Sequence, residues 1–108
     1  MKKQIFYGKH TINNKDIDAV VRVLKKNNLT QGKEVNLFEK KLSDKFKAKF
    51  CTVVANGTAA LFLVGKLLKF NKEDTVLTTP LSFLASSNCI ELNGAKTQFI
   101  DIDQKTYT

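Results

Sequence analysis

The sequence has no tryptophan, one proline, one histidine and two cysteines among its 108 residues. Long apolar runs are also missing: the longest, Ala59–Gly65, is far shorter than the roughly 20 residues that a membrane-spanning helix needs. Polar residues between Gln4 and His10 interrupt any apolar segment that a secretory signal would require. We therefore expect a cytoplasmic chain that makes no contact with a membrane.

The shortage of histidine and cysteine narrows the possible chemistry. His10 lies in a segment without helical or strand periodicity, so no Ser-His-Asp or Cys-His arrangement can be built around it. Cys51 and Cys89 stand alone in apolar surroundings, which favours buried, reduced thiols. Asp101 and Asp103 have no further metal-ligating residue near them. No metal site is expected.

Arginine is nearly absent from a strongly basic chain. Arg22 is the one arginine among 18 basic residues, and the formal net charge is +8. The excess lies in residues 1–50, with 13 basic and 5 acidic side chains, because residues 51–108 carry five of each. Base readout and bidentate phosphate binding rely on arginine, so a solvated lysine-rich surface is favoured over a nucleic-acid interface. A polyanionic ligand such as a nucleotide diphosphate remains compatible with this charge.

The first half of the chain predicts an irregular arm followed by two helices. Residues 1–13 show no periodicity. A helix is expected from Asn14 to the stop at Asn27-Asn28, with Asn13 or Asn14 as its N-cap, because apolar residues then recur at helical spacing. After a break at residues 29–32, a second helix is expected from the stripe of Val35, Phe38, Leu42 and Phe46.

The second half alternates strand and helix patterns. Strands are expected at Phe50–Ala55, Thr75–Thr79 and Lys96–Ile102. Between them we expect a helix at Ala59–Phe70, which is apolar nearly all round and hence buried, and a helix at Phe83–Leu92 that stops at Asn93-Gly94. This alternation predicts an α/β fold with a parallel sheet.

Two segments are candidate ligand sites. The turn Asn56-Gly57-Thr58 precedes a helix, whose free amides and dipole suit a phosphate, although an ordinary N-cap would use the same residues. It is not a P-loop, because no Gly-Lys-Ser/Thr follows. The segment Thr78–Asn88 follows a strand, where α/β sheets bind ligands. Phe83 in it could stack on a planar ring or pack in the core.

Taken in order, these segments resemble the DegT/DnrJ family of pyridoxal-phosphate-dependent sugar-nucleotide aminotransferases. The resemblance runs from about Ile12 to Tyr107. It implies a fold-type I enzyme with an α/β/α, mostly parallel sheet, in which residues 1–13 are the arm and residues 14–108 the first part of the major domain. The matching segments are Asp16–Val20, Leu29–Lys33, Phe38-Glu39, Asn56–Leu61, Thr78–Asn88 and Phe99–Asp103.

The resemblance also implies an activity. Tyr7, Leu29–Lys33 and Thr78–Phe83 are most similar to the subgroup that makes a UDP-linked 4-amino-4,6-dideoxy sugar for pseudaminic acid, although that subgroup often has Ser-Ala-Thr-Ser at residues 56–59. The implied reaction transfers an amino group, from glutamate as donor, to a 4-keto-6-deoxy sugar nucleotide for cell-surface polysaccharide biosynthesis. The complete enzyme is expected to be a homodimer.

By the same resemblance, the cofactor pyridoxal 5′-phosphate would be held through its phosphate by the amides of Gly57 and Thr58 and by the Thr58 hydroxyl. Phe83 would stack on the pyridine ring. Three further residues would lie near the sugar nucleotide: Tyr7, Thr30 and Ser82.

The family's catalytic residues have no counterpart in this chain. The aspartate that pairs with the pyridine nitrogen and the Schiff-base lysine normally follow well after the third strand, and none of the 17 lysines matches that position. We expect the chain to be an amino-terminal part that is inactive alone. The alternative is a small basic α/β module that binds a nucleotide or nucleic acid at the same turn.

Overall fold

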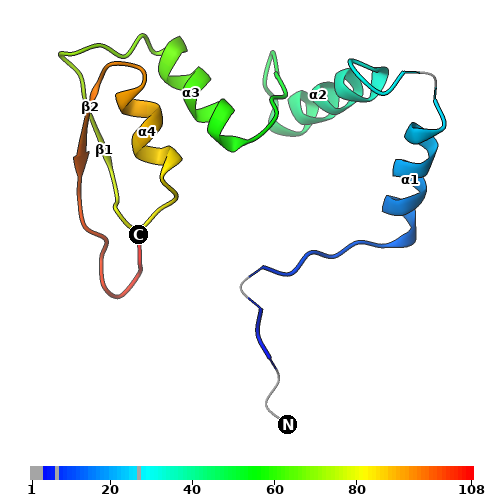
Figure 1. The fold of residues 1–108 in the computed structure, drawn as a ribbon, viewed down its shortest axis with the longest axis horizontal. Coiled ribbons are helices and arrows are strands. Elements are labelled where there is room, and N and C mark those ends of the chain that lie inside the picture. The colour runs from blue at the N-terminus through cyan, green and yellow to red at the C-terminus, as the bar shows by residue number, and fades with distance from the viewer. Residues whose placement is uncertain (1–3, 7, 27) are drawn as a thin grey trace. The chain divides into compact units, whose positions relative to one another are not determined.

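The computed structural model describes residues 4–6, 8–26 and 28–108, and it forms two compact units, Met1–Val53 and Val54–Thr108. The first unit contains helices α1 (Asn14–Leu24) and α2 (Lys33–Phe46), whereas residues 4–6 and 8–13 form no helix or strand (Figure 1). Both helices confirm the periodicity seen in the sequence.

The start of α1 is fixed by a cap. Asn13 is the N-cap: its Oδ1 accepts the Lys15 N–H at 2.9 Å, and its own N–H donates to Asp16 Oδ2 at 2.9 Å. Such reciprocal bonds satisfy amides that the first helical turn leaves free. Beyond the other end of α1, Lys26 pairs with Glu34 of α2. The hydrogen bond from Lys26 lowers the pKa of Glu34, but the pair is exposed and contributes little stability.

The second unit is a βαβ arrangement preceded by a helix. Its elements are α3 (Gly57–Leu67), β1 (Thr75–Thr78), α4 (Ala85–Glu91) and β2 (Lys96–Phe99). The strands pair in parallel, from Thr75 opposite Lys96 to Thr78 opposite Phe99. Helix α4 contacts both strands and α3, and Figure 1 shows it beside the strand pair. The predicted parallel α/β pattern is confirmed here.

The buried core of this unit is small. It consists of the side chains of Ala85, Cys89, Ile90 and Ala95, with Phe70 and Val76 packed against it. Gly94, at φ +94°, makes the turn from α4 into β2, a backbone conformation that glycine adopts without strain. Both cysteines are free thiols; Cys89 is buried and Cys51 half-buried.

The prediction of a strand at Phe50–Ala55 is wrong for this structure, because these residues form no strand. A strand exists only through hydrogen bonds to a neighbouring strand. The sheet described here contains β1 and β2 alone, and the Val53 N–H donates instead to the Glu39 carboxylate at 2.9 Å. The segment is apolar as expected, but no strand among the described residues pairs with it.

The expectation of a helix at Ala59–Phe70 is confirmed, but the expectation that this helix is buried is wrong. The helix forms as α3, yet Gly65 is its one buried residue, and Leu67 is 80% exposed. Among the elements of its unit, α3 packs on α4, which covers one side of it. Within the described residues, no helix is long and apolar enough to cross a membrane.

Lys69 follows α3 in the left-handed region, at φ +57°, and Phe70 N–H closes the helix end by donating to Gly65 O at 3.2 Å. A non-glycine residue pays about 1–2 kcal/mol for this conformation. Lys69→Gly should therefore raise the free energy of unfolding of the full-length protein by about 1 kcal/mol, measured by denaturant titration. Lys66→Gly, inside the helix, is the matched control and should lower it by about 1 kcal/mol. Equal losses in both variants would contradict the prediction.

Candidate functional site

The amino terminus of α3 offers two free amides. Asn56 is its N-cap, and Asn56 Oδ1 accepts the Ala59 N–H at 2.9 Å, while Asn56 O accepts the Ala60 N–H at 3.2 Å. Among the described residues, nothing accepts a hydrogen bond from the Gly57 or Thr58 N–H. These two donors lie at the positive end of the helix dipole, which favours an anion.

The space at this terminus is open. A Cβ added to Gly57 would meet no atom within 4 Å, and both Gly57 and Thr58 are exposed. An anion can therefore approach the backbone closely, and the Thr58 hydroxyl adds a third donor in the first turn. The capping role of Asn56 and the open donors at residues 57 and 58 are compatible with each other, because they use different amides.

Gly57, Thr58 and Phe83 lie on one cavity. Its volume is about 520 Å³, within the range of small-molecule sites, and its other lining residues are Ala60, Leu61, Ala85 and Ser86. Phe83 is 76% exposed, which argues against the alternative that it packs in the core. The structure thus brings together three residues that the sequence analysis took from two separate motifs. An apolar wall beside amide donors suits a planar ring that bears a phosphate.

Ser82 lies on an adjoining cavity of about 180 Å³, which Phe83, Thr79 and Phe99 also line. Its Oγ is 3.0 Å from Oγ of Ser86, and Ser86 lines both cavities. Ser86 was not among the expected site residues. The sequence carried no local signal for it, because Ser82 lies before α4, where the four-residue spacing of a helix does not apply.

The carboxyl ends of the two strands meet at this same edge of the sheet. Ile100 N–H donates to Thr78 O at 2.9 Å, so the ladder continues one step past β2 and holds both chain segments together. Asp103 follows in a tight turn, where its Oδ1 accepts bonds from Thr106 N–H and Lys105 N–H, each at 2.8 Å, and from the Thr106 hydroxyl at 3.1 Å. These bonds lower the pKa of Asp103.

A carboxyl whose pKa is lower in the folded than in the unfolded state stabilises the fold above its unfolded pKa, and the stabilisation is lost as pH falls through the folded value. Asp103→Asn should therefore reduce the stability of the full-length protein at neutral pH, and the difference from the parent should shrink below about pH 4. Unfolding curves of both proteins at several pH values between about 7 and about 3, a range that includes the usual aspartate pKa, would measure this difference in stability. A difference that grows in acid would contradict the assignment.

Thr30, one of the residues expected near the sugar nucleotide, belongs to the first unit. Thr30 is exposed between α1 and α2, in a segment where Lys26, Asn28, Gly32 and Lys33 line a hollow of about 380 Å³. Tyr7 lies outside the described residues. The roles of both residues stay predictions.

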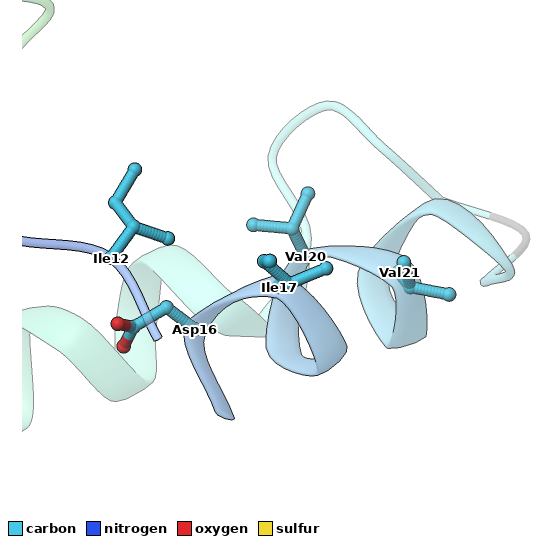
Figure 2. A pocket seen from close by; sticks show the side chains of 5 residues that line it. All are labelled: Ile12, Asp16, Ile17, Val20 and Val21. Carbon is cyan, nitrogen blue, oxygen red and sulfur yellow. The ribbon is translucent and has the colours of Figure 1, made fainter. Parts of the chain in front are cut away.

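An apolar hollow of about 270 Å³ on α1 is not a candidate site. Figure 2 shows the side chains that line it, Ile12, Ile17, Val20 and Val21, together with the carboxylate of Asp16. Asp16 accepts the Asn13 N–H and is thereby engaged in the helix cap. The remaining lining is aliphatic and offers no group for chemistry.

Comparison with known proteins gives concordant results. Residues 10–108 match the model of the DegT/DnrJ/EryC1/StrS aminotransferase family. The chain is 43% identical over 98 residues to a UDP-4-amino-4,6-dideoxy-N-acetyl-β-L-altrosamine transaminase of Campylobacter jejuni, a match that covers 91% of this chain and 26% of that protein. It is 39% identical over 92 residues to a UDP-2-acetamido-2-deoxy-3-oxo-D-glucuronate aminotransferase of Pseudomonas aeruginosa, covering 84% of this chain and 26% of the relative.

The fold agrees with these sequence matches. The X-ray structure of an aminotransferase from Psychrobacter cryohalolentis superposes with a TM-score of 0.79 at 32% identity, over 94% of this chain and 26% of that one. The chain thus spans about a quarter of the length of the curated relatives it matches. A family model that covers residues 10–108 and a superposition of this quality establish that the chain belongs to the DegT/DnrJ/EryC1/StrS aminotransferase family.

Proposed function

We propose that the full-length protein carrying this chain is a pyridoxal-phosphate-dependent aminotransferase that acts on a nucleotide sugar. The observation that supports this most strongly is the single cavity on which Gly57, Thr58 and Phe83 lie. Membership of an aminotransferase family supplies the reaction class. The second unit then provides one part of the cofactor site.

The residues of the cavity fit the cofactor. The free N–H groups of Gly57 and Thr58 and the Thr58 hydroxyl would bind its phosphate, and the absence of a Cβ at residue 57 leaves the phosphate room to approach. The ring of Phe83 would lie against the pyridine ring. When bound, the cofactor supplies the electron sink and carries the amino group between the two substrates. The role of the cavity residues would be to bind and orient the cofactor.

The substrate we propose is a UDP-linked 4-keto-6-deoxy sugar of cell-surface glycan biosynthesis, with glutamate as amino donor. The names of the two relatives above share a UDP sugar but differ in ring position, with a 4-amino product in one and a 3-oxo substrate in the other. The higher identity belongs to the 4-amino case, which supports the 4-keto proposal. Ser82, Thr30 and Tyr7 are the residues proposed to contact the sugar nucleotide.

Two further features belong to this proposal. The full-length protein would act as a homodimer, and the reaction would take place in the cytoplasm, where free thiols such as Cys51 and Cys89 remain reduced.

The test is an assay of the full-length protein with pyridoxal 5′-phosphate, glutamate and a UDP-4-keto-6-deoxy-N-acetylhexosamine. We expect 2-oxoglutarate to form together with a sugar nucleotide whose keto oxygen has been replaced by an amino group, identified by mass spectrometry. A UDP-3-keto sugar is the matched control and should react much more slowly. Loss of water from the sugar without gain of nitrogen, or no reaction with either keto sugar, would contradict the proposal.

A further inference from the structure

The side chain of Asn93 ties α3 to α4. It is 8% exposed, and its Nδ2 donates to Cys89 O of α4 at 2.7 Å and to Phe62 O of α3 at 3.1 Å. Both acceptors are carbonyl oxygens, so the amide nitrogen must face them, because the opposite orientation would place Oδ1 against two acceptors. Both hydrogens of the amide are thereby used, one on each helix.

Gly65 allows the close approach that these bonds require. It is the one buried residue of α3, and a Cβ added to it would collide with Asn93 Nδ2 and lie 2.8 Å from Asn93 Cγ. Real Cβ atoms do not approach other heavy atoms so closely, so any side chain at residue 65 would push the amide or the helix away. The contact between α3 and α4 is therefore set at this point by a glycine and an amide.

Burying an amide at this core position costs stability. Asn93 Oδ1 is buried and has no hydrogen-bond partner among the described residues. An apolar side chain of similar volume would fill the same space without an unpaired acceptor. Apolar contacts are not directional, whereas hydrogen bonds are. Hydrogen bonds therefore fix the angle and distance between two helices more closely than apolar contact does. These observations favour the interpretation that Asn93 fixes the relative placement of α3 and α4, and does not merely stabilise the core.

This geometry bears on the cavity. Gly57 and Thr58 lie at the start of α3, whereas Phe83 precedes α4 and Ser86 lies in its first turn, and all four line the cavity. Phe62 follows Gly57 by five residues, about 7.5 Å of helix rise, so a small change of angle at the Asn93 contact displaces the start of α3. We propose, on the basis of the proposed function, that Asn93 is a positioning residue that, with Gly65, holds the phosphate-binding amides at a fixed separation from Phe83.

The test uses the full-length protein and pyridoxal 5′-phosphate. Asn93→Leu removes both hydrogen bonds and keeps the branched shape of the side chain, and it should weaken cofactor binding on the order of tenfold and change the visible circular dichroism of the bound cofactor. Gly65→Ala should act in the same way. In the double variant Gly65→Ala, Asn93→Ala the clash is relieved but both hydrogen bonds are absent, so its cofactor affinity should stay below that of the parent, as in Asn93→Leu.

A matched control separates positioning from general destabilisation. Val76 packs against the core of the same unit and does not line the cavity. Val76→Ala should lower the melting temperature but leave the cofactor affinity and its circular dichroism unchanged.

The outcomes separate this inference from the proposed function. A parent protein that does not bind the cofactor overturns both. A parent that binds it, with an Asn93→Leu variant of the same affinity and spectrum, overturns the positioning role alone. So does a loss of affinity that Val76→Ala reproduces at equal loss of melting temperature. If Asn93→Leu does not fold, Gly65→Ala and the double variant decide, and parental cofactor affinity in the double variant would show that the hydrogen bonds are dispensable and would overturn the inference.

Discussion

Expressed alone, the 108-residue chain is expected to show no cooperative thermal transition. It exposes 10297 Å² of surface. A compact protein of 12.1 kDa exposes roughly 6,000 Å², and two separate compact halves would expose about 7,300 Å² together. The excess is too large to result from the division into two units alone, so the chain is poorly covered within at least one of them.

Much of the excess surface is apolar. Among the residues that the structure describes, four hydrophobic side chains are buried, whereas large side chains such as Phe50, Leu67 and Leu68 are exposed. Apolar surface on this scale normally becomes covered by other protein or leads to aggregation. The isolated chain should therefore be molten or aggregated, and without transaminase activity, as judged by calorimetry and amide NMR. A monomer with dispersed amide signals and one sharp cooperative transition would contradict this expectation.

Thr58→Val in the full-length protein is expected to weaken the binding of pyridoxal 5′-phosphate by about tenfold to a hundredfold. The change keeps the shape of the side chain and removes a hydroxyl from the amino terminus of α3. A hydrogen bond from such a hydroxyl to a charged phosphate contributes roughly 1.5–3 kcal/mol, which corresponds to that loss of affinity. Equilibrium dialysis of the apoprotein against the cofactor would measure it.

Thr75→Val is the matched control. It makes the same chemical change on β1, at an exposed position that does not line the cavity. Its cofactor affinity should equal that of the parent. If Thr58→Val also binds with parental affinity, the residue has no part in phosphate binding, and the first turn of α3 is only a helix terminus capped by Asn56.

Local patterns predicted most of the elements. The helix stripe after Asn13 and the stop at Asn93-Gly94 depend on short-range effects, namely side-chain caps and glycine's freedom at positive φ, and both are found in the structure. The parallel pairing of β1 and β2 followed from the strand–helix–strand order.

What the sequence could not predict depends on partners that are distant along the chain. The run at residues 50–55 has the composition of a buried strand, but a strand also needs a neighbour, and none pairs with it here. The apolar surface of α3 similarly indicates burial without saying what covers it. The contact of Asn93 with Phe62 joins residues 31 positions apart, and neither residue carries a local signal of it.

The same contrast between local patterns and distant contacts applies to the candidate site. The turn chemistry suggested Gly57 and Thr58 as phosphate-binding residues, with an ordinary N-cap as the alternative, whereas the exposure of Phe83 and its place on the cavity come only from the structure. Ser86 was missed because its importance comes from lining two cavities, which no local pattern reveals.

The most direct test of the account is a crystal structure of the full-length protein with pyridoxal 5′-phosphate. We expect phosphate oxygens about 2.7–3.2 Å from the backbone nitrogens of Gly57 and Thr58, with the pyridine ring against the ring of Phe83. A cofactor phosphate bound elsewhere, with the first turn of α3 facing only solvent, would contradict it.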